Sequence, residues 1–236
     1  MMRALIVDDE VYSREEMEAL LGETGEFVIV GKCANAPEAI RAVNRERPDV
    51  LFLDVQMPGI DGFELLGMID ETIMPAVVFV TAYDAYAFKA FEENALDFLL
   101  KPVEKRRLAK TVEKLKRRFS EGVKPVFALP DIKKIPCIHS ARIKLINLPD
   151  VEQVRSGETG VYVICDQGEF YTDLTLQVLE DKTDLVRCHK QFLINIDQVD
   201  EITLRENGGA EIKTKSGRFV PVSRRYLKLL REKLLF

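Results

Sequence analysis

The first 119 residues alternate short apolar runs with helix-like segments, and this alternation strongly limits the folds open to the chain. The apolar runs cover residues 3–7, 27–33, 50–53, 76–80 and 97–100. The helix-like segments cover 13–21, a stretch capped by Asn35, 62–69, 85–93 and 104–119. Strands that alternate with helices form parallel sheets with helices on both faces. We therefore expect a doubly wound α/β fold with five parallel strands.

Polar side chains stand where four of these strands end. Asp8 and Asp9 follow the first strand, Asp54 the third, Thr81 the fourth and Lys101 the fifth. In parallel sheets, functional groups gather beyond the carboxyl ends of the strands. Any one of these residues could simply cap a helix, but all of them together favour a common site.

Three carboxylates at one rim repel one another, and Mg²⁺ relieves this because it prefers oxygen ligands. A lysine and a hydroxyl at the same rim suit the oxygens of a phosphoryl group. Together these groups favour an aspartyl phosphate, with one carboxylate as nucleophile. A haloacid-dehalogenase-like phosphatase also forms such a phosphate, but it needs a second aspartate two residues after the nucleophile. Gln56 stands at that position after Asp54, so this alternative fails.

The motifs Asp8-Asp9, LDVQMPG over 53–59, Thr81-Ala82 and FLLKP over 98–102 resemble the receiver domain of two-component response regulators. The resemblance covers residues 1–119 and implies a flavodoxin-like fold. It also implies a sensor histidine kinase, expected to be membrane-bound, as phosphoryl donor.

The resemblance implies a role for each rim residue. Asp54 is the expected phosphoacceptor. Mg²⁺ is expected to be bound by the side chains of Asp9 and Asp54, by the backbone carbonyl of Gln56, and by Asp8 mainly through water. Lys101 is expected to pair with the phosphoryl group, across a cis peptide bond to Pro102.

Two further residues are implied in switching. Thr81 would donate to a phosphoryl oxygen, and Phe98 would turn inward; a permanent core position is the alternative for Phe98. The rearrangement would favour a homodimer through the face made by the fourth helix, the fifth strand and the fifth helix.

The second half of the chain has a different pattern. Residues 120–131 have the composition of a linker. Residues 132–236 carry short alternating runs separated by turn signals, which predicts a mainly-β domain. The runs cover 142–148, 151–155, 161–165, 168–172, 202–204, 210–214 and 219–222, with helical patterns over 175–180 and 224–235.

Charge divides the chain in the same way. Residues 1–104 hold 8 Lys and Arg against 21 Asp and Glu, whereas the remainder holds 26 against 18. The total net charge of −5 therefore conceals a basic second half. Such a half is typical of a nucleic-acid-binding module, although chance variation of surface charge is the simpler alternative.

Two segments of the second half resemble the LytTR DNA-binding domain: LVRCHKQFLINID over 185–197 and PVSRRY over 221–226. The resemblance extends over about 136–236 and makes the whole chain similar to LytTR-type response regulators. In that family, loops of a β-rich module enter successive DNA grooves. Enzymatic outputs are disfavoured because this half carries no GGDEF-like run and no P-loop.

The resemblance implies Lys190 and Arg224 as DNA contacts. A third contacting loop covers 157–161, where Thr159 is the candidate, although this loop departs from the usual family residues. Arg225 and Lys228 are expected to contact phosphates. The DNA target is expected to be promoter DNA with repeated half-sites. An output that binds another protein is the alternative, whereas an RNA-binding antiterminator is disfavoured because those outputs are helical.

Localisation is expected to be cytoplasmic, without insertion into a membrane. No apolar run approaches the ~18 residues that a membrane helix needs. The acidic run 8–10 interrupts the N-terminal apolar run, which excludes a signal peptide. The four cysteines are scattered, which favours reduced thiols. Cys188 could sense oxidation, although an inert buried thiol is the simpler interpretation.

Overall fold

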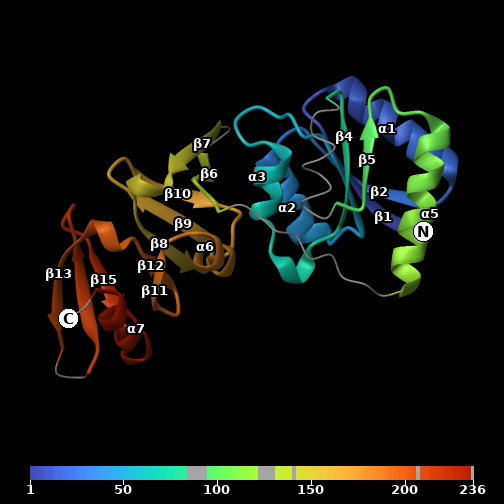
Figure 1. The fold of residues 1–236 in the computed structure, drawn as a ribbon. Helices are drawn as coiled ribbons and strands as arrows, with labels where there is room; N and C mark the ends of the chain where they lie inside the picture. The colour runs from blue at the N-terminus through green and yellow to red at the C-terminus, as the bar shows by residue number, and fades with distance from the viewer. Residues whose placement is uncertain (84–94, 122–130, 140–141, 206–207, 235–236) are drawn as a thin grey trace. The chain divides into compact units, whose positions relative to one another are not determined.

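The computed structural model describes residues 1–83, 95–121, 131–139, 142–205 and 208–234. The chain divides into two compact units, Met1–Pro130 and Asp131–Phe236 (Figure 1).

The first unit contains the predicted five-stranded parallel sheet, with strand order β2-β1-β3-β4-β5. Its strands are β1 (Met2–Val7), β2 (Phe27–Cys33), β3 (Val50–Leu53), β4 (Ala76–Thr81) and β5 (Asp97–Leu100). Its helices are α1 (Val11–Thr24), α2 (Ala36–Glu46), α3 (Gly62–Gly67) and α5 (Lys105–Glu121), with a 3-10 turn, η1 (Glu71–Ile73). The helix predicted over 85–93 lies outside the described residues.

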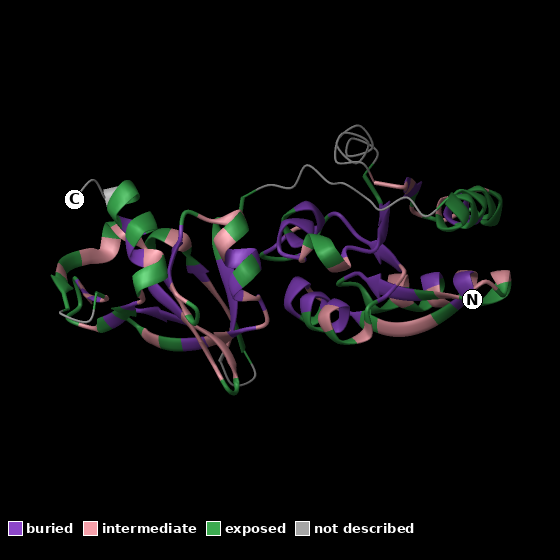
Figure 2. Ribbon diagram, turned by 90° about the horizontal axis from the view of Figure 1, so that it is seen from below, coloured by how far each residue is buried: buried purple, intermediate pink, exposed green. Residues whose placement is uncertain are grey.

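Helices cover both faces of this sheet. On one face, α1 and α5 pack against the strands through a cluster that includes Leu21, Phe52 and Leu115. On the other face, the Phe63 ring of α3 packs against the Phe79 ring of β4, with centroids 4.6 Å apart. The strands β3 and β4 are buried along their whole length; Figure 2 colours buried residues purple. Burial on both faces explains why their sequences are continuously apolar.

Local signals set the ends of the helices. The Asn35 side chain accepts a hydrogen bond from the Glu38 backbone N–H at 3.0 Å, which confirms the predicted cap of α2. At α3, Asp61 and Glu64 form a reciprocal capping box.

The second unit is mainly β, as predicted. A seven-stranded antiparallel sheet has the order β11-β12-β8-β9-β10-β6-β7, and a three-stranded sheet has the order β13-β14-β15. The strands are β6 (Lys134–His139), β7 (Arg142–Asn147), β8 (Val151–Gly157), β9 (Gly160–Cys165), β10 (Gly168–Thr172), β11 (Val186–His189), β12 (Phe192–Ile194), β13 (Val199–Leu204), β14 (Ala210–Thr214) and β15 (Phe219–Val222). The helices are α6 (Leu176–Lys182) and α7 (Arg224–Leu234), with 3-10 turns η3 (Leu148–Asp150) and η4 (Ile196–Gln198).

The two sheets and α7 share a core. Leu227 and Leu230 of α7 pack with Cys188 of β11, Ile194 of β12 and Val220 of β15. The start of α7, where candidate DNA contacts lie, is therefore held against the end of β11.

Candidate functional site

The polar residues at the strand ends of the first unit converge, as the sequence predicted. Lys101 Nζ lies 2.6 Å from Asp8 Oδ2 and 2.8 Å from Asp54 Oδ2. Asp8 and Asp54 are buried, with exposed fractions of 4% and 7%, whereas Asp9 is exposed. The backbone holds the two buried carboxylates in place, since Asp8 N donates to Cys33 O and Asp54 N donates to Val7 O.

Asp8, Asp9 and Asp54 form a possible cation site, because one oxygen from each lies within 4.8 Å of the others. Two negative charges at that separation repel by roughly 3 kcal/mol at an effective dielectric constant of about 20. The single charge of Lys101 leaves this cluster negative. An oxygen-rich, partly open and negatively charged cluster fits Mg²⁺, which takes a few carboxylate oxygens and keeps several waters.

The charges in this cluster influence one another. Burial raises the pKa of Asp8 above its ordinary value, although the hydrogen bond from Lys101 acts in the opposite direction. Burial also acts to lower the pKa of Lys101, but hydrogen bonds to Asp54 and Asp8 outweigh it and raise that pKa. Lys101 therefore remains an ammonium at neutral pH, with its charge directed between the two carboxylates.

Thr81, at the end of β4, is fully buried. Among the described residues, its Oγ1 is one of two buried side-chain polar atoms without a hydrogen-bond partner; the other is Gln153 Oε1 in the second unit. A buried hydroxyl without a partner is costly. Register places Thr81 opposite Leu100, and Lys101 N donates to Thr81 O at 2.9 Å, so Thr81 and Lys101 are neighbours at the rim.

The turn after Asp54 is tightly packed. A side chain at Gly62 would place its Cβ 2.4 Å from the Asp54 carbonyl oxygen, so glycine is required where α3 begins. Gln56 is exposed, and its backbone N–H donates to Asp54 Oδ1 at 3.3 Å. The Lys101–Pro102 peptide bond is cis.

Of the predicted dimer face, the structure describes β5 and α5. Phe98 is half-buried, and its carbonyl oxygen accepts a hydrogen bond from Arg107 Nη2 at 2.9 Å. Asp97 is buried and accepts from Arg107, Thr111 and Lys114 of α5. Burial opposes its ionisation, but these hydrogen bonds hold the pKa of Asp97 well below its ordinary range.

The candidate DNA contacts of the second unit are all exposed: Thr159, Lys190, Arg224, Arg225 and Lys228. Their loops adjoin one another. Ser156 N, just before the loop of Thr159, donates to Gln191 O at 2.8 Å, beside Lys190. Ser223 N, just before Arg224, donates to Cys188 O at 3.0 Å, two residues before Lys190. Backbone hydrogen bonds therefore bring the three predicted loops together.

The candidates differ in how free their side chains are. Within the described part of the chain, no carboxylate forms an ion pair with Lys190 or Arg224. Thr159 Oγ1 shares a hydrogen bond of 2.7 Å with the hydroxyl of Tyr162, and Lys228 lies 4.0 Å from Glu232. The guanidinium of Arg225 lies over the ring of Tyr226.

Sequence reasoning missed the residues that support these loops. Arg187 is buried beneath the turn that carries Lys190, and Tyr162 lies beside Thr159. The motif around 185–197 contains Arg187, but a buried arginine has no periodic signal that separates it from a surface one. Its role is visible only in the contacts.

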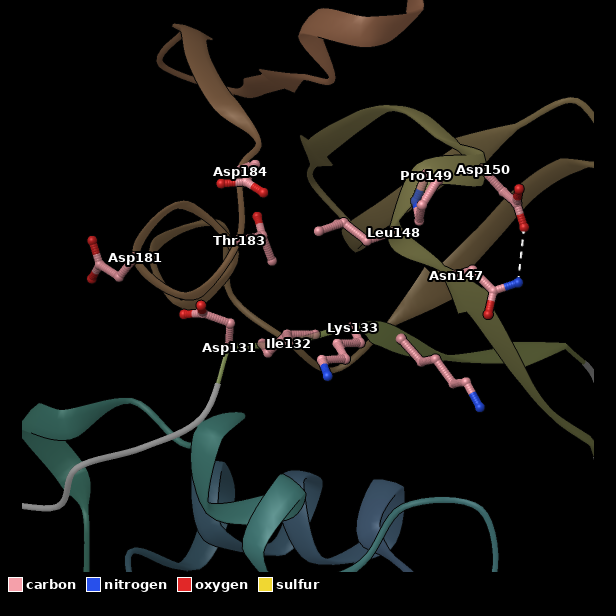
Figure 3. Close-up of a pocket in the computed structure, with 11 residues that line it drawn as sticks. Asp131, Ile132, Lys133, Asn147, Leu148, Pro149, Asp150, Asp181, Thr183 and Asp184 are labelled. Carbon is pink, nitrogen blue, oxygen red and sulfur yellow. Dashed lines mark hydrogen bonds between the residues drawn. The ribbon is translucent and has the colours of Figure 1, made fainter.

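A cavity lies elsewhere in the second unit. It has a volume of about 850 Å³ and lies beside η3 and the end of α6 (Figure 3). Its lining includes Asp150 and Asp181, which already accept hydrogen bonds from Asn147 and Gln177. None of the predicted site residues lines it.

No described helix is long and apolar enough to cross a membrane.

Comparisons with known proteins agree with the predicted identity of each unit. The response regulator receiver domain family matches residues 4–113, and the LytTr DNA-binding domain family matches residues 141–235. An uncharacterized response regulatory protein of Vibrio cholerae is 50% identical over the full length of both chains. The transcriptional regulatory protein BtsR is 51% identical in Salmonella typhi and 49% identical in Escherichia coli K12, over 98% of this chain in each case. The chain therefore belongs to the response regulators that join a receiver domain to a LytTR DNA-binding domain.

Proposed function

We propose that this chain accepts a phosphoryl group on Asp54 from a sensor histidine kinase and then binds promoter DNA through its LytTR domain to regulate transcription. The observation that carries the first part is the convergence of Asp54 with Asp8 and Lys101 at the rim where β4 ends in Thr81, whose hydroxyl has no partner among the described residues. The BtsR relatives, which are named transcriptional regulatory proteins, support the second part.

In the proposed transfer, a carboxylate oxygen of Asp54 forms a bond to phosphorus while the bond from phosphorus to the donor's nitrogen breaks. Lys101 donates to the phosphoryl oxygens from its present position between the carboxylates. Asp9 and Asp54 would hold Mg²⁺ with the carbonyl of Gln56, and Asp8 would hold it mainly through water. When bound, Mg²⁺ would offset the negative charge of the transferring group.

The switch begins at Thr81. A phosphoryl oxygen on Asp54 would give the Thr81 hydroxyl an acceptor, which it lacks among the described residues, and Phe98 would then turn inward. Phosphorylation stabilises this state only through such contacts, which are absent without the phosphoryl group. The shift would favour a homodimer through the face that includes β5 and α5, so that two DNA-binding units act together on repeated half-sites.

On DNA, Lys190 and Arg224 would contact base edges, and Arg225 and Lys228 would contact phosphates. Thr159 would contact DNA from the third loop. A positioned base contact contributes about 1–3 kcal/mol of discrimination, whereas phosphate contacts mainly set affinity and its salt dependence.

The proposed domain limits are 1–119 for the receiver, 120–131 for the linker and 132–236 for the DNA-binding domain. The kinase would be membrane-bound, and this chain would act in the cytoplasm. Its enzymatic activity would be limited to its own phosphoryl transfer and dephosphorylation.

The test of the receiver half is Asp54→Asn, which keeps the size of the side chain and removes the nucleophilic charge. Wild-type protein should become phosphorylated with a small phosphoryl donor and Mg²⁺, as measured by intact mass, and the variant should not. A variant that gains one phosphoryl group at the wild-type rate would place the acceptor elsewhere.

The test of the output half is Arg224→Ala. This variant should bind duplex DNA more weakly while its phosphorylation is unchanged, because Arg224 lies in the other unit. Equal affinity of variant and wild type for a selected duplex would remove Arg224 from the interface. Failure of the wild type to select any duplex would favour an output that binds protein.

A further inference from the structure

We propose that Arg187 is a positioning residue for DNA recognition: anchored to Glu180 of α6, it holds the turn from which Lys190 projects. This inference rests on the proposed DNA-binding function and adds a residue whose side chain is itself largely buried. Its side chain is only 10% exposed, so Arg187 acts through the turn.

The anchor is an ion pair with α6. Arg187 Nε lies 2.8 Å from Glu180 Oε2, and Nη2 lies 2.7 Å from the same oxygen. The helix is itself fixed, because Leu176, Val178 and Leu179 are buried and α6 packs against β8 and β12. Arg187 therefore joins the turn between β11 and β12 to a firmly packed element.

The remaining nitrogen of the guanidinium reaches the turn. Arg187 Nη1 donates to the backbone carbonyl of Lys190 at 3.3 Å. A planar guanidinium presents several N–H donors in a rigid fork, so it can bind the carboxylate and the carbonyl at the same time. A lysine at 187 would keep the charge but would lose this fixed geometry.

Two more hydrogen bonds complete the turn. Gln191 N donates to His189 Nδ1 at 3.2 Å, and Ser156 N donates to Gln191 O at 2.8 Å. The second bond joins the turn to the end of β8, where the loop of Thr159 begins. Support from Arg187 would therefore reduce the freedom of Lys190 before DNA binds, which lowers the entropy cost of the contact.

The experiment uses the full chain, treated with acetyl phosphate and Mg²⁺. Wild-type protein first selects a duplex from a randomised pool. Arg187→Lys, Lys190→Ala and the double variant are then titrated with that duplex and with the unselected pool. Arg187→Lys should lower affinity for the selected duplex by roughly five- to tenfold, within the range for one base contact, and should change binding to the unselected pool far less.

The double variant shows whether Arg187 acts by positioning Lys190 or contributes to DNA affinity independently of it. Arg187→Lys should cause no further loss when Lys190 is already alanine, because its effect passes through that side chain. Full additivity, or no effect of Arg187→Lys on the selected duplex, would overturn the inference. If Lys190→Ala binds like the wild type, the inference fails while the DNA-binding function stands; if the wild type selects no duplex, both fail.

Arg218→Lys is the matched control. Arg218 Nη1 lies 2.6 Å from Glu152 Oε1, a buried carboxylate of the same unit, and the other hydrogen bonds of this pair's side chains involve Thr214 and Ser216. This variant should retain wild-type affinity for the selected duplex. An equal loss in Arg218→Lys and Arg187→Lys would point to general destabilisation and overturn the inference.

Discussion

Replacement of Thr81 by valine should stabilise the unphosphorylated protein and impair the phosphorylated one. Thr81 is fully buried, and its hydroxyl lacks a partner among the described residues. A buried polar group left unpaired costs about 1–3 kcal/mol, and valine replaces that hydroxyl with a methyl group of similar shape. We expect the free energy of unfolding to rise by about 1–2 kcal/mol, or roughly 4 °C or more in Tm.

The same variant should respond less to phosphorylation. A hydrogen bond to a charged group contributes about 1.5–3 kcal/mol, so its loss should reduce the phosphorylation-dependent gain in DNA affinity about 10- to 100-fold. Thr81→Ser retains the hydroxyl and should keep most of the gain. DNA titration of phosphorylated and unphosphorylated protein measures the gain in affinity for each variant.

Thr111→Val is the matched control for stability. Thr111 is equally buried in the same unit, but its hydroxyl donates to Asp97 Oδ2 at 2.7 Å. The same change should therefore destabilise the receiver by about 1–3 kcal/mol. Scanning calorimetry of the full chain measures both variants, with the receiver transition identified by its rise on addition of Mg²⁺. Destabilisation by Thr81→Val as large as that by Thr111→Val would show that the Thr81 hydroxyl is not an uncompensated buried group.

Three further predictions follow from packing and ionisation. Gly62→Ala should destabilise the receiver by about 1–3 kcal/mol and slow phosphorylation, because the added Cβ meets the Asp54 carbonyl oxygen at 2.4 Å; wild-type melting and rate would contradict this. Folding lowers the pKa of Asp97, so its ionised carboxylate stabilises the folded receiver. This stabilisation is fully present above the unfolded-state pKa of about 4 and is lost as pH falls through the lower folded-state pKa. Asp97→Asn should thus weaken the acid dependence of unfolding, and an unchanged dependence would remove Asp97 as its source. Burial raises the pKa of Cys33, Cys137 and Cys188 to about 12. These thiols should therefore resist a disulfide reagent in native protein and react only after denaturant is added. Fast reaction of Cys188 in native protein would show that its thiol is accessible.

The receiver was predictable because each strand has a clear end. Strands β2, β3 and β5 match the predicted ranges, and β4 is one residue longer because Thr81 still belongs to it. Polar residues follow continuously apolar strands, so the strand ends and the candidate site were found together. That the Thr81 hydroxyl has no partner in the described part of the chain was not predictable, since it depends on packing around one atom.

The second half was less predictable because its strands are short and irregular. Strand β6 was missed because Pro136 interrupts its alternating pattern. The strand tolerates this proline because its pairing with β10 lies at Ile138, away from the proline nitrogen, and because Thr172 Oγ1 donates to Pro136 O at 2.8 Å. Strands β11 and β12 have only four and three residues and flank a tight turn. Strand β13 begins at Val199, earlier than predicted, because its exposed acidic residues hide the alternation.

In the proposed function, phosphorylation of Asp54 increases selective binding to DNA. The most direct measurement is a titration of the full chain with a selected duplex, with and without acetyl phosphate and Mg²⁺, for wild type and Asp54→Ala. The phosphorylated wild type should bind the selected duplex more tightly than the unphosphorylated protein, and Asp54→Ala should not respond. Equal selective binding with and without phosphorylation, or an equal response in Asp54→Ala, would contradict it.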